Sequence, residues 1–380
     1  MLNQNQINLP DIDEAFEKFV RRVLETQTFG VTRKPIELRC VSSSSKKKAD
    51  RFTFAIPYAR HTLQWTVLFN SNCPEMGPDF EFHDELFLAN PDCDTIETHI
   101  PSLANWEAIK PDSLLCVLNE LTLCYKQHQI DLLSRNEQHL HLQYTTLIDN
   151  ADVCSKDVEI ILLPDAESPN EVRFVIQLAM DFSRLPGRSH NAVNDAAMLT
   201  ITYQQQNWNK GIPLLHLSTT LEETFNKAGF SNLSIPPLSR DQSVVDYVTH
   251  MKKMISDKID SIIDCYEKRM NFVSTLLFFQ RRNVVEYDAT DFTRITILLE
   301  EQDFYFLVHF ILSPTFPAQQ PNVMLQSIYH VNPKTDELVT HPVSRMLYSP
   351  RWESKRMIAE ILKQVVQKDA ICLRNAISIR

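Results

Sequence analysis

One order of predicted elements, a helix, four strands and a second helix, occurs three times along this chain of 380 residues. The helices are predicted from apolar residues at helical spacing, and the strands from short apolar runs bounded by turn residues. Strands whose apolar residues are nearly uninterrupted indicate sheets that are covered by helices on at least one face. The chain is therefore predicted to be an α+β protein of tandem modules, each an antiparallel four-strand meander flanked by helices.

The first module is predicted to span residues 1–150. Asp11 is the expected cap of its opening helix, because Glu14 follows at the capping-box spacing. Its closing helix is expected from Ser113 to Ile148, after an irregular connection through Trp106. The strands are expected at residues 36–41, 52–56, 63–69 and 80–82.

Two later segments repeat this order. In the middle segment, residues 151–240, Thr219 and Glu222 form a second capping box. The third segment, residues 241–380, begins with a long helix over residues 242–279 and ends with a helix from Glu353 to about Asn375. The strands are expected at residues 158–163, 172–180, 198–203 and 214–217 of the middle segment, and at 284–287, 294–299, 304–312 and 322–329 of the third.

An internal repeat supports a duplication of the first and third segments. Phe69 is followed by Pro74, Pro78, Phe80 and Phe82, and Leu312 is followed at the same spacings by Pro317, Pro321, Val323 and Leu325. Both sets lie between the third and fourth predicted strands. Each is followed by a tryptophan, Trp106 or Trp352, before the closing helix.

The five glycines exclude several enzyme classes, since no two of them lie within one loop. Loops that bind phosphate through backbone N–H groups need clustered glycines, so a P-loop ATPase, a Rossmann dehydrogenase and a protein kinase are not expected. The G-x-S-x-G nucleophile elbow is absent for the same reason.

One histidine pair has the spacing of a metal site. His139, His141 and Asp152 match the ligand spacing of JAMM-type zinc isopeptidases, but Asp149 stands where the serine of that motif belongs. The pair also falls in a predicted helix, where alternate side chains point in different directions. No metal site and no cofactor are predicted, and the zinc isopeptidase stays open as a minor alternative.

Charge and composition predict a soluble intracellular protein. A net charge of -10 argues against nucleic-acid binding, which needs a basic surface. No segment resembles a signal peptide or a membrane span, so no membrane partner is expected. Eight scattered cysteines are typical of reduced thiols in the cytoplasm or nucleus.

The third segment resembles the ubiquitin-conjugating fold. Its proline pair is similar to that family's Y-P-x-x-P-P turn, and Tyr329, His330 and Asn332 resemble the Y-H-P-N motif. The resemblance implies a nucleophilic cysteine about eight residues beyond the asparagine, where this chain has Thr340. Threonine cannot replace a thiolate at neutral pH, so the module is predicted to be catalytically inactive, with a degenerate motif at the end of a strand.

A cysteine in the first module leaves an enzymatic alternative open. Cys93 follows Asn90 after three residues and lies thirteen residues before Trp106, without a His-Pro-Asn before it. An atypical ubiquitin-conjugating enzyme that uses Cys93 is therefore the alternative function. A structural thiol in a loop is the simpler interpretation.

The whole chain resembles the BRE family, the brain and reproductive organ-expressed proteins. The segments that carry the resemblance are Asp50–Phe52, Thr62–Trp65, Pro74–Phe80, Val284–Ala289, Phe306–His309 and Tyr348–Trp352. The residues before Pro35 depart from the family pattern, and the middle segment matches least clearly. The resemblance implies ubiquitin-conjugating-variant (UEV-like) modules at both ends and an RWD-like domain between them.

The resemblance also implies a function in the ubiquitin pathway. BRE-like proteins are non-catalytic subunits of the BRISC deubiquitinase complex and of a related nuclear complex in the DNA damage response and DNA repair. The implied partners are a JAMM-type zinc deubiquitinase subunit specific for lysine-63-linked chains, an Abraxas-like scaffold subunit and a MERIT-type von Willebrand A-like subunit. Ubiquitin itself is a further candidate ligand. The chain is thus expected to be a scaffold and not an enzyme.

The segment from Tyr348 to Trp352 contains the candidate contact with the MERIT-type subunit. Tyr348, Pro350, Arg351 and Trp352 combine the aromatic and arginine side chains that dominate binding hot spots. The alternative is that Trp352 packs under the closing helix. For Tyr329 and His330 the alternative is a purely structural strand end.

Overall fold

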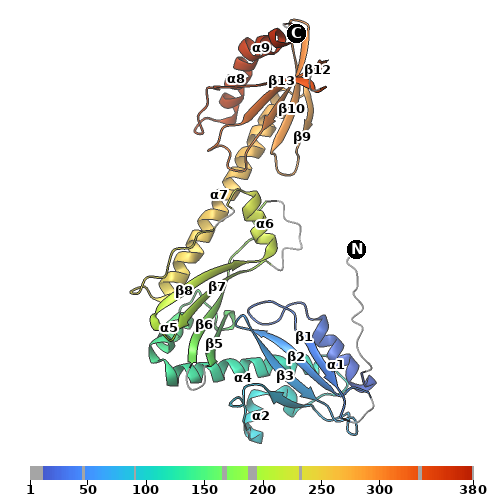
Figure 1. The fold of residues 1–380 in the computed structure, drawn as a ribbon, viewed down its shortest axis with the longest axis vertical. Coiled ribbons are helices and arrows are strands. Elements are labelled where there is room, and N and C mark those ends of the chain that lie inside the picture. Colours follow the sequence, from blue (N-terminus) through green and yellow to red (C-terminus); the bar gives the residue numbers. More distant parts are fainter. Residues whose placement is uncertain are drawn as a thin grey trace. The chain divides into compact units, whose positions relative to one another are not determined.

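The computed structural model describes residues 12–44, 48–89, 91–164, 169–186, 195–230, 233–332 and 336–378. The chain forms two compact units, each built from helices and antiparallel sheets (Figure 1). The first unit comprises Met1–Ala179, Ala196–His216 and Ile235–His250, and the second comprises Met180–Asp195, Leu217–Ser234 and Met251–Arg380. The predicted α+β class is confirmed, whereas the division into domains at residues 150 and 240 stays a prediction.

The first sheet of the first unit is a meander of four antiparallel strands in the order β1-β2-β3-β4. The strands are β1 (Glu37–Ser42), β2 (Arg51–Tyr58), β3 (His61–Leu68) and β4 (Asp79–Phe82). The helices are α1 (Glu14–Glu25), α2 (Cys93–His99), α3 (Pro101–Ala104), α4 (Ser113–Asn136) and α5 (Gln138–Ile148). The four strands predicted for this segment are therefore present.

Three details of the helices differ from the predictions. Asp13 caps α1 by accepting a hydrogen bond from the Ala15 N–H (3.1 Å), and the predicted cap Asp11 lies outside the described residues. The predicted helix from residue 113 to 148 is interrupted at Glu137, whose φ of -137° and ψ of 77° are not helical. The connection before α4 contains the short helices α2 and α3, which are too short to give a periodic apolar pattern.

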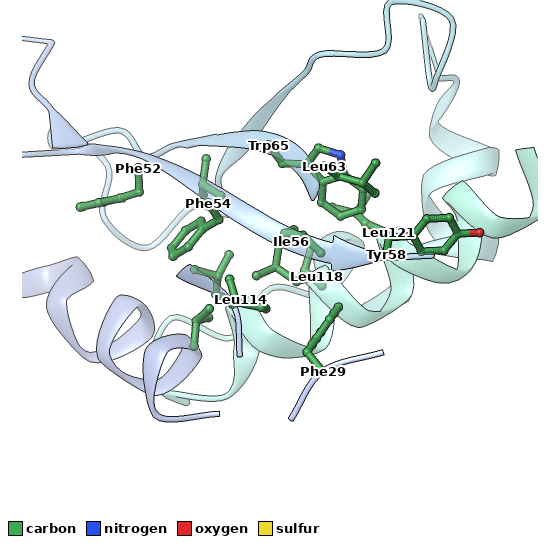
Figure 2. Packing of buried hydrophobic residues seen from close by; sticks show 14 of the residues in the cluster. Phe29, Phe52, Phe54, Ile56, Tyr58, Leu63, Trp65, Leu114, Leu118 and Leu121 are labelled. Atoms are coloured by element: carbon green, nitrogen blue, oxygen red, sulfur yellow. The ribbon is translucent and has the colours of Figure 1, made fainter. Parts of the chain in front are cut away.

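The core of this module lies between β2 and the helices α1 and α4. Phe52, Phe54, Ile56 and Tyr58 alternate along β2, and all four are completely buried. Figure 2 shows these side chains together with the α4 leucines Leu114, Leu118 and Leu121. The four β2 residues recur at every second position, which is the strand pattern from which the sequence predicted β2.

The second sheet of the first unit has the order β5-β6-β7-β8. Its strands are β5 (Val158–Pro164), β6 (Pro169–Leu178), β7 (Ala197–Gln204) and β8 (Asn207–Leu217), and the short helix η1 (Ser155–Asp157) precedes them. The helix α6 (Thr219–Lys227) follows in the chain and belongs to the second unit. The predicted capping box is wrong, because Ser218 is the N-cap of α6 and no side chain caps the helix.

The second unit contains a sheet with the order β13-β12-β11-β10-β9. Its strands are β9 (Val284–Tyr287), β10 (Arg294–Glu301), β11 (Phe304–Ile311), β12 (Asn322–Val331) and β13 (Leu338–Pro342). Apolar side chains of α7 (Val244–Phe279), α8 (Ser354–Gln364) and α9 (Ala370–Ser378) share its buried core. A π-helical turn, η3 (Val365–Asp369), joins α8 to α9. β13 is a fifth strand that the prediction of a four-strand meander missed.

The strand register supports the repeat predicted from the proline spacing. In the first sheet, Leu68 lies opposite Arg51 on one side and opposite Asp79 on the other. In the second unit, Ile311 lies in the same way between Arg294 and Asn322. The two meanders therefore share spacing and pairing across three strands.

The same two-residue turn joins the second and third strand of each meander. Ala59 and Arg60, with φ values of 45° and 56°, connect β2 to β3, and Gln302 and Asp303, with φ values of 51° and 61°, connect β10 to β11. Positive φ at both central positions is typical of a type I′ turn, whose backbone twist matches the twist of the two strands that it joins. Residues other than glycine are strained there, by about 1–2 kcal/mol each, so the rest of the structure must hold these turns in place.

Candidate functional site

The degenerate conjugating-enzyme motif lies where β12 runs into β13. The Asn332 N–H donates to the Glu337 carbonyl oxygen (2.7 Å), and the Asp336 N–H donates to the Asn332 carbonyl oxygen (2.8 Å). Asn332 therefore closes the turn between the two strands with its backbone. Thr340 lies within β13, directly opposite Gln326 of β12. The position at which the resemblance implies a nucleophile belongs to a paired strand.

Tyr329 and His330 stand at the exposed end of β12. The Tyr329 side chain is 73% exposed. The His330 ring nitrogen Nδ1 lies 2.8 Å from the hydroxyl of the fully buried Ser327, and the His330 N–H donates to the same oxygen (3.3 Å). His330 is thus held by Ser327, while Tyr329 is free to contact another molecule.

Cys93 is exposed and begins the short helix α2, which Asp92 caps by accepting from the Thr95 N–H (2.8 Å). Asn90, which suggested a catalytic setting, lies outside the described residues. All eight cysteines are free thiols. Cys93 itself has the surroundings of a surface thiol at the start of a helix.

The histidine pair of the isopeptidase alternative lies on α5, as the predicted helix implied. His139 is exposed, and His141 is half-buried. In the part of the chain that the structure describes, no three histidine, cysteine or acidic side chains are grouped so that they could hold a metal ion. The geometry of His139, His141 and Asp152 therefore does not favour the zinc isopeptidase.

The Tyr348–Trp352 segment divides into buried and exposed residues. Tyr348 and Trp352 pack against the core of the second unit, and the Tyr348 hydroxyl donates to the Pro317 carbonyl oxygen. The Arg356 guanidinium lies over the Trp352 ring, 4.3 Å from its centroid. Pro350 and Arg351 are exposed. The aromatic residues anchor the segment, and the other two are the ones that face solvent.

A polar site within the first unit was not predicted from the sequence. Glu159, on β5, is 4% exposed, and its carboxylate accepts hydrogen bonds from the Val31 N–H (2.9 Å) and the Ala59 N–H (2.6 Å). The Tyr58 hydroxyl donates to the Ile160 carbonyl oxygen (2.9 Å). These contacts join the β2–β3 turn to the second sheet. The sequence feature that could have indicated this site is the single carboxylate of Glu159 in the otherwise apolar strand β5.

Burial shifts the pKa values of Glu159 and Lys126 at this junction. It raises the pKa of the Glu159 carboxyl, an effect that the two N–H donors and the nearby Lys126 ammonium oppose only in part. Burial likewise lowers the pKa of Lys126, which donates to the carbonyl oxygen of Ser155. Gly30 is required beside this carboxylate: its φ is +62°, and a Cβ there would lie 2.9 Å from Glu159 Oε1.

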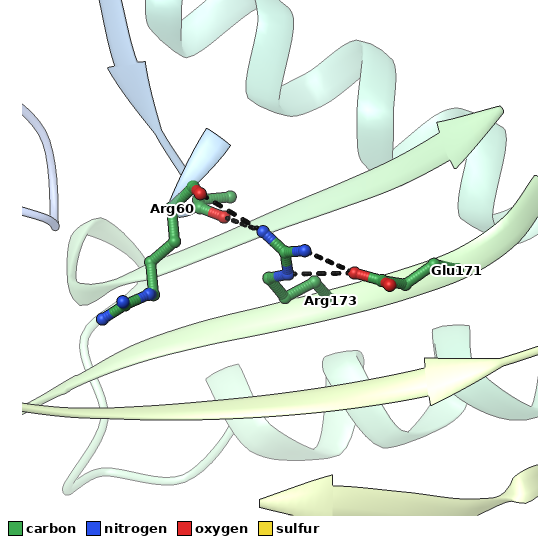
Figure 3. Close-up of polar contacts among 4 residues, drawn as sticks. Arg60, Glu171 and Arg173 are labelled. Atoms are coloured by element: carbon green, nitrogen blue, oxygen red, sulfur yellow. Dashed lines mark hydrogen bonds and ion pairs between the residues drawn. The ribbon is translucent and has the colours of Figure 1, made fainter. Parts of the chain in front are cut away.

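An arginine of β6 binds the carbonyl groups of the same turn (Figure 3). Arg173 donates from Nη1 to the carbonyl oxygens of Ala59 (3.4 Å) and Arg60 (3.3 Å). Its guanidinium is fixed by Glu171, which accepts from Nε at 3.1 Å and from Nη2 at 2.5 Å. Glu159 and Arg173 together bind both the donor and the acceptor groups of the strained turn. Such an arrangement makes a stiff connection between the turn and the second sheet.

None of the helices in the described part of the chain has the length and hydropathy that crossing a bilayer would require.

The comparison with known proteins identifies the family. The model of the family "Brain and reproductive organ-expressed protein (BRE)" matches residues 10–331. A Danio rerio protein named "BRISC and BRCA1-A complex member 2" is 32% identical over 326 residues, which cover 84% of this chain and 82% of that protein. A Branchiostoma floridae protein of the same name is 28% identical over 369 residues, 94% of each chain.

These matches also correct one expectation about the N-terminal segment. The family model begins at residue 10, so it includes the residues before Pro35 that were expected to depart from the family pattern. It ends at residue 331, so the Tyr348–Trp352 segment lies beyond the matched range. With a match over most of its length, the chain belongs to the BRE family.

Proposed function

We propose that this chain is a non-catalytic scaffold subunit of a JAMM-type deubiquitinase complex that cleaves lysine-63-linked ubiquitin chains. The observation that carries the proposal is the similarity, over 94% of its length, to a protein named as a member of the BRISC and BRCA1-A complexes. We assign to it the JAMM-type, Abraxas-like and MERIT-type subunits as partners, with ubiquitin as a further ligand. It acts in both the cytoplasm and the nucleus.

The junction around Glu159 supports a positional mechanism. A scaffold raises the effective concentration of its partners only if its binding modules keep a fixed geometry. One buried hydrogen bond from Ala59 to Glu159 and two bonds from Arg173 hold the β2–β3 turn against the second sheet, and a second bond to Glu159 holds Val31 there. The UEV-like domain of residues 1–150 and the β5–β8 sheet of the RWD-like domain, both within the first unit, would thereby act as one rigid element.

The third module, residues 241–380, is assigned to the MERIT-type subunit. Pro350 and Arg351 are exposed beside a ring that is held by the core, which is the arrangement of an anchored contact segment. Tyr329, at 73% exposure, adds a second contact at the end of β12. Thr340 and Asn332 are remnants of an ancestral catalytic motif, because both serve the strand pairing and the turn of β12 and β13.

The test is reconstitution of the complex from purified subunits. This chain is mixed with the JAMM-type, Abraxas-like and MERIT-type subunits, and cleavage of lysine-63-linked diubiquitin is compared with and without it. We expect the chain alone to be inert and to change the assembly or activity of the complex. Arg351→Glu is expected to weaken binding of the MERIT-type subunit roughly tenfold, since charge reversal at a contact arginine turns an attraction into a repulsion.

Arg281→Glu is the matched control, because Arg281 is exposed on the same unit and the charge change is identical. Equal binding by the two variants would remove the assignment of Arg351. Failure of the wild-type chain to join any of the three subunits would refute the scaffold function itself. A ubiquitin thioester that Cys93→Ser abolishes would instead support the conjugating-enzyme alternative.

A further inference from the structure

One side of β8 exposes an apolar stripe. Gly211 marks the inward side of the strand, because a Cβ there would lie 2.7 Å from Leu238 and 2.9 Å from Ile201. Successive side chains of a strand point to opposite faces, so Ile212, Leu214 and His216 lie on the other side. Ile212 is 49% exposed and Leu214 is 54% exposed.

The same side of the sheet carries positive charge. Arg173 lies opposite Thr202, the neighbour of the inward-facing Ile201, and so belongs to the outer side with the β8 stripe. Its guanidinium holds the Arg60 backbone, and the Arg60 side chain extends away from it (Figure 3). The charges of Arg60 and Lys34 reach His216: together with burial, the larger cause, they lower its pKa to about 4.

Two of these cations form no ion pair within the described residues, whereas Arg173 is paired with Glu171. Neither Lys34 nor Arg60 forms an ion pair there. The pKa of Arg60 is lowered by burial and, to a smaller extent, by the charge of the neighbouring Arg173. This is notable in a chain whose net charge is -10. An anion at this position would relieve the repulsion between the two arginines.

Two buried polar atoms on the same side have no hydrogen-bond partner in the part of the chain that the structure describes. They are Nε2 of His216 and the hydroxyl oxygen of Thr200, a residue that is only 5% exposed. Thr200 lies opposite Val175, whose side chain packs on the core of the first module, so it points to the side of the sheet that also carries Arg173. Buried polar atoms without partners are uncommon, and each calls for an explanation, such as an ordered water or a bound group.

We propose that the surface formed by Lys34, Arg60, Ile212, Leu214 and His216 binds an extended acidic peptide segment of a partner protein. We call it the β8 surface. The carboxylates of the segment pair with the two cations, and its apolar side chains cover Ile212 and Leu214. β8 is the last strand in the order of its sheet, and extended peptides commonly bind along such strands. A small anion would satisfy the charges but would leave the apolar stripe exposed.

The test measures peptide binding to the isolated full chain by fluorescence anisotropy. The probe is a fluorescein-labelled peptide of alternating glutamate and valine. One comparison peptide carries glutamine for glutamate, and another carries serine for valine. We expect the glutamate–valine peptide to bind at least about tenfold more tightly than either comparison peptide, because both charge and apolar contact contribute.

Substitutions locate the binding on the surface. Arg60→Glu is expected to weaken binding about tenfold and Leu214→Ser about fivefold, whereas Arg281→Glu on the second unit leaves it unchanged. Thermal melting confirms that each variant is folded. Equal binding of the glutamine peptide, or an Arg60→Glu variant that binds like wild type, would overturn the proposal. Pyrophosphate binding as tightly as the peptide would assign the surface to a small anion instead.

This inference does not depend on the proposed scaffold function. The probe is added to the isolated chain, so its failure to bind leaves the reconstitution experiment unaffected.

Discussion

Removal of the Glu159 carboxylate should loosen the connection between the two sheets of the first unit. The carboxylate accepts from the N–H groups of Val31 at 2.9 Å and Ala59 at 2.6 Å, and it is 4% exposed. In Glu159→Ala both donors are left buried without an acceptor. Lys126, itself buried, loses the opposite charge that favours its protonated form.

The expected cost follows from these contacts. Each orphaned N–H costs about 1–3 kcal/mol, so the two together cost a few kcal/mol. Removing the buried carboxylate recovers its own desolvation penalty, which offsets part of this. We expect Glu159→Ala to lower the free energy of unfolding of the first unit by about 3 kcal/mol. Glu159→Gln keeps one acceptor and should cost about half as much.

Two measurements check this result. Three of the four tryptophans, Trp65, Trp106 and Trp208, belong to the first unit, so urea unfolding followed by tryptophan fluorescence in a Trp352→Phe background reports on that unit. Hydrogen exchange followed by mass spectrometry then reports on the Val31 and Ala59 amides directly. A loss below about 1 kcal/mol, with unchanged exchange of both amides, would show that the carboxylate does not hold the turn.

The raised pKa of Glu159 adds a pH dependence with a definite sign. The folded state keeps the proton at pH values where the unfolded state has lost it. The wild-type free energy of unfolding should therefore fall as pH rises above the ordinary value of 4.5, toward the raised pKa. Glu159→Gln should remove this slope.

Two further predictions concern the second unit. Arg269 is 8% exposed and donates to the carbonyl oxygens of Asp291 (3.0 Å) and Pro314 (2.7 Å). Arg269→Met should therefore lower the free energy of unfolding in urea by about 2 kcal/mol. Arg281→Met, at an exposed site, should lower it by less than about 0.5 kcal/mol. Equal losses would contradict the role of these bonds. Burial raises the pKa of Asp288, but hydrogen bonds from the Thr293 hydroxyl and three backbone N–H groups lower it to about 2. The stabilisation by the Asp288 carboxylate is present above the ordinary pKa of 3.8 and is lost as pH falls toward 2. Asp288→Asn should therefore cost about 1 kcal/mol at neutral pH and less at pH 3, as measured by hydrogen exchange of residues 284–301. A cost that grows on acidification would refute this.

The strands could be predicted from the sequence because burial of one face leaves a local pattern. Phe52, Phe54, Ile56 and Tyr58 alternate along β2, and the proline spacing of the repeat reappears as the shared register of Leu68 and Ile311. The strand β13 was missed, since its five residues carry too short a pattern. Capping was mispredicted at Thr219, because the capping-box spacing does not determine which residue leaves the helical conformation.

The candidate contact segments were also found by pattern and resemblance, but their geometry was not. Only the structure separates the anchored Tyr348 and Trp352 from the exposed Pro350 and Arg351. Which side of a short irregular segment meets the core depends on neighbours far away in the sequence. No local periodicity encodes that choice.

The sequence by itself determined the family, the α+β class and the order of the strands, because these follow from local apolar periodicity and from matches along the chain. Tertiary structure alone decided that Glu159 and Arg173 bind the turn at Ala59 and Arg60, about a hundred residues away in the chain. It likewise decided that the charge of Arg60 reaches His216, more than 150 positions further along the chain in a separate strand. Hydrogen bonds and charges of this kind join residues that are distant in sequence, and only folding brings such residues within reach of one another.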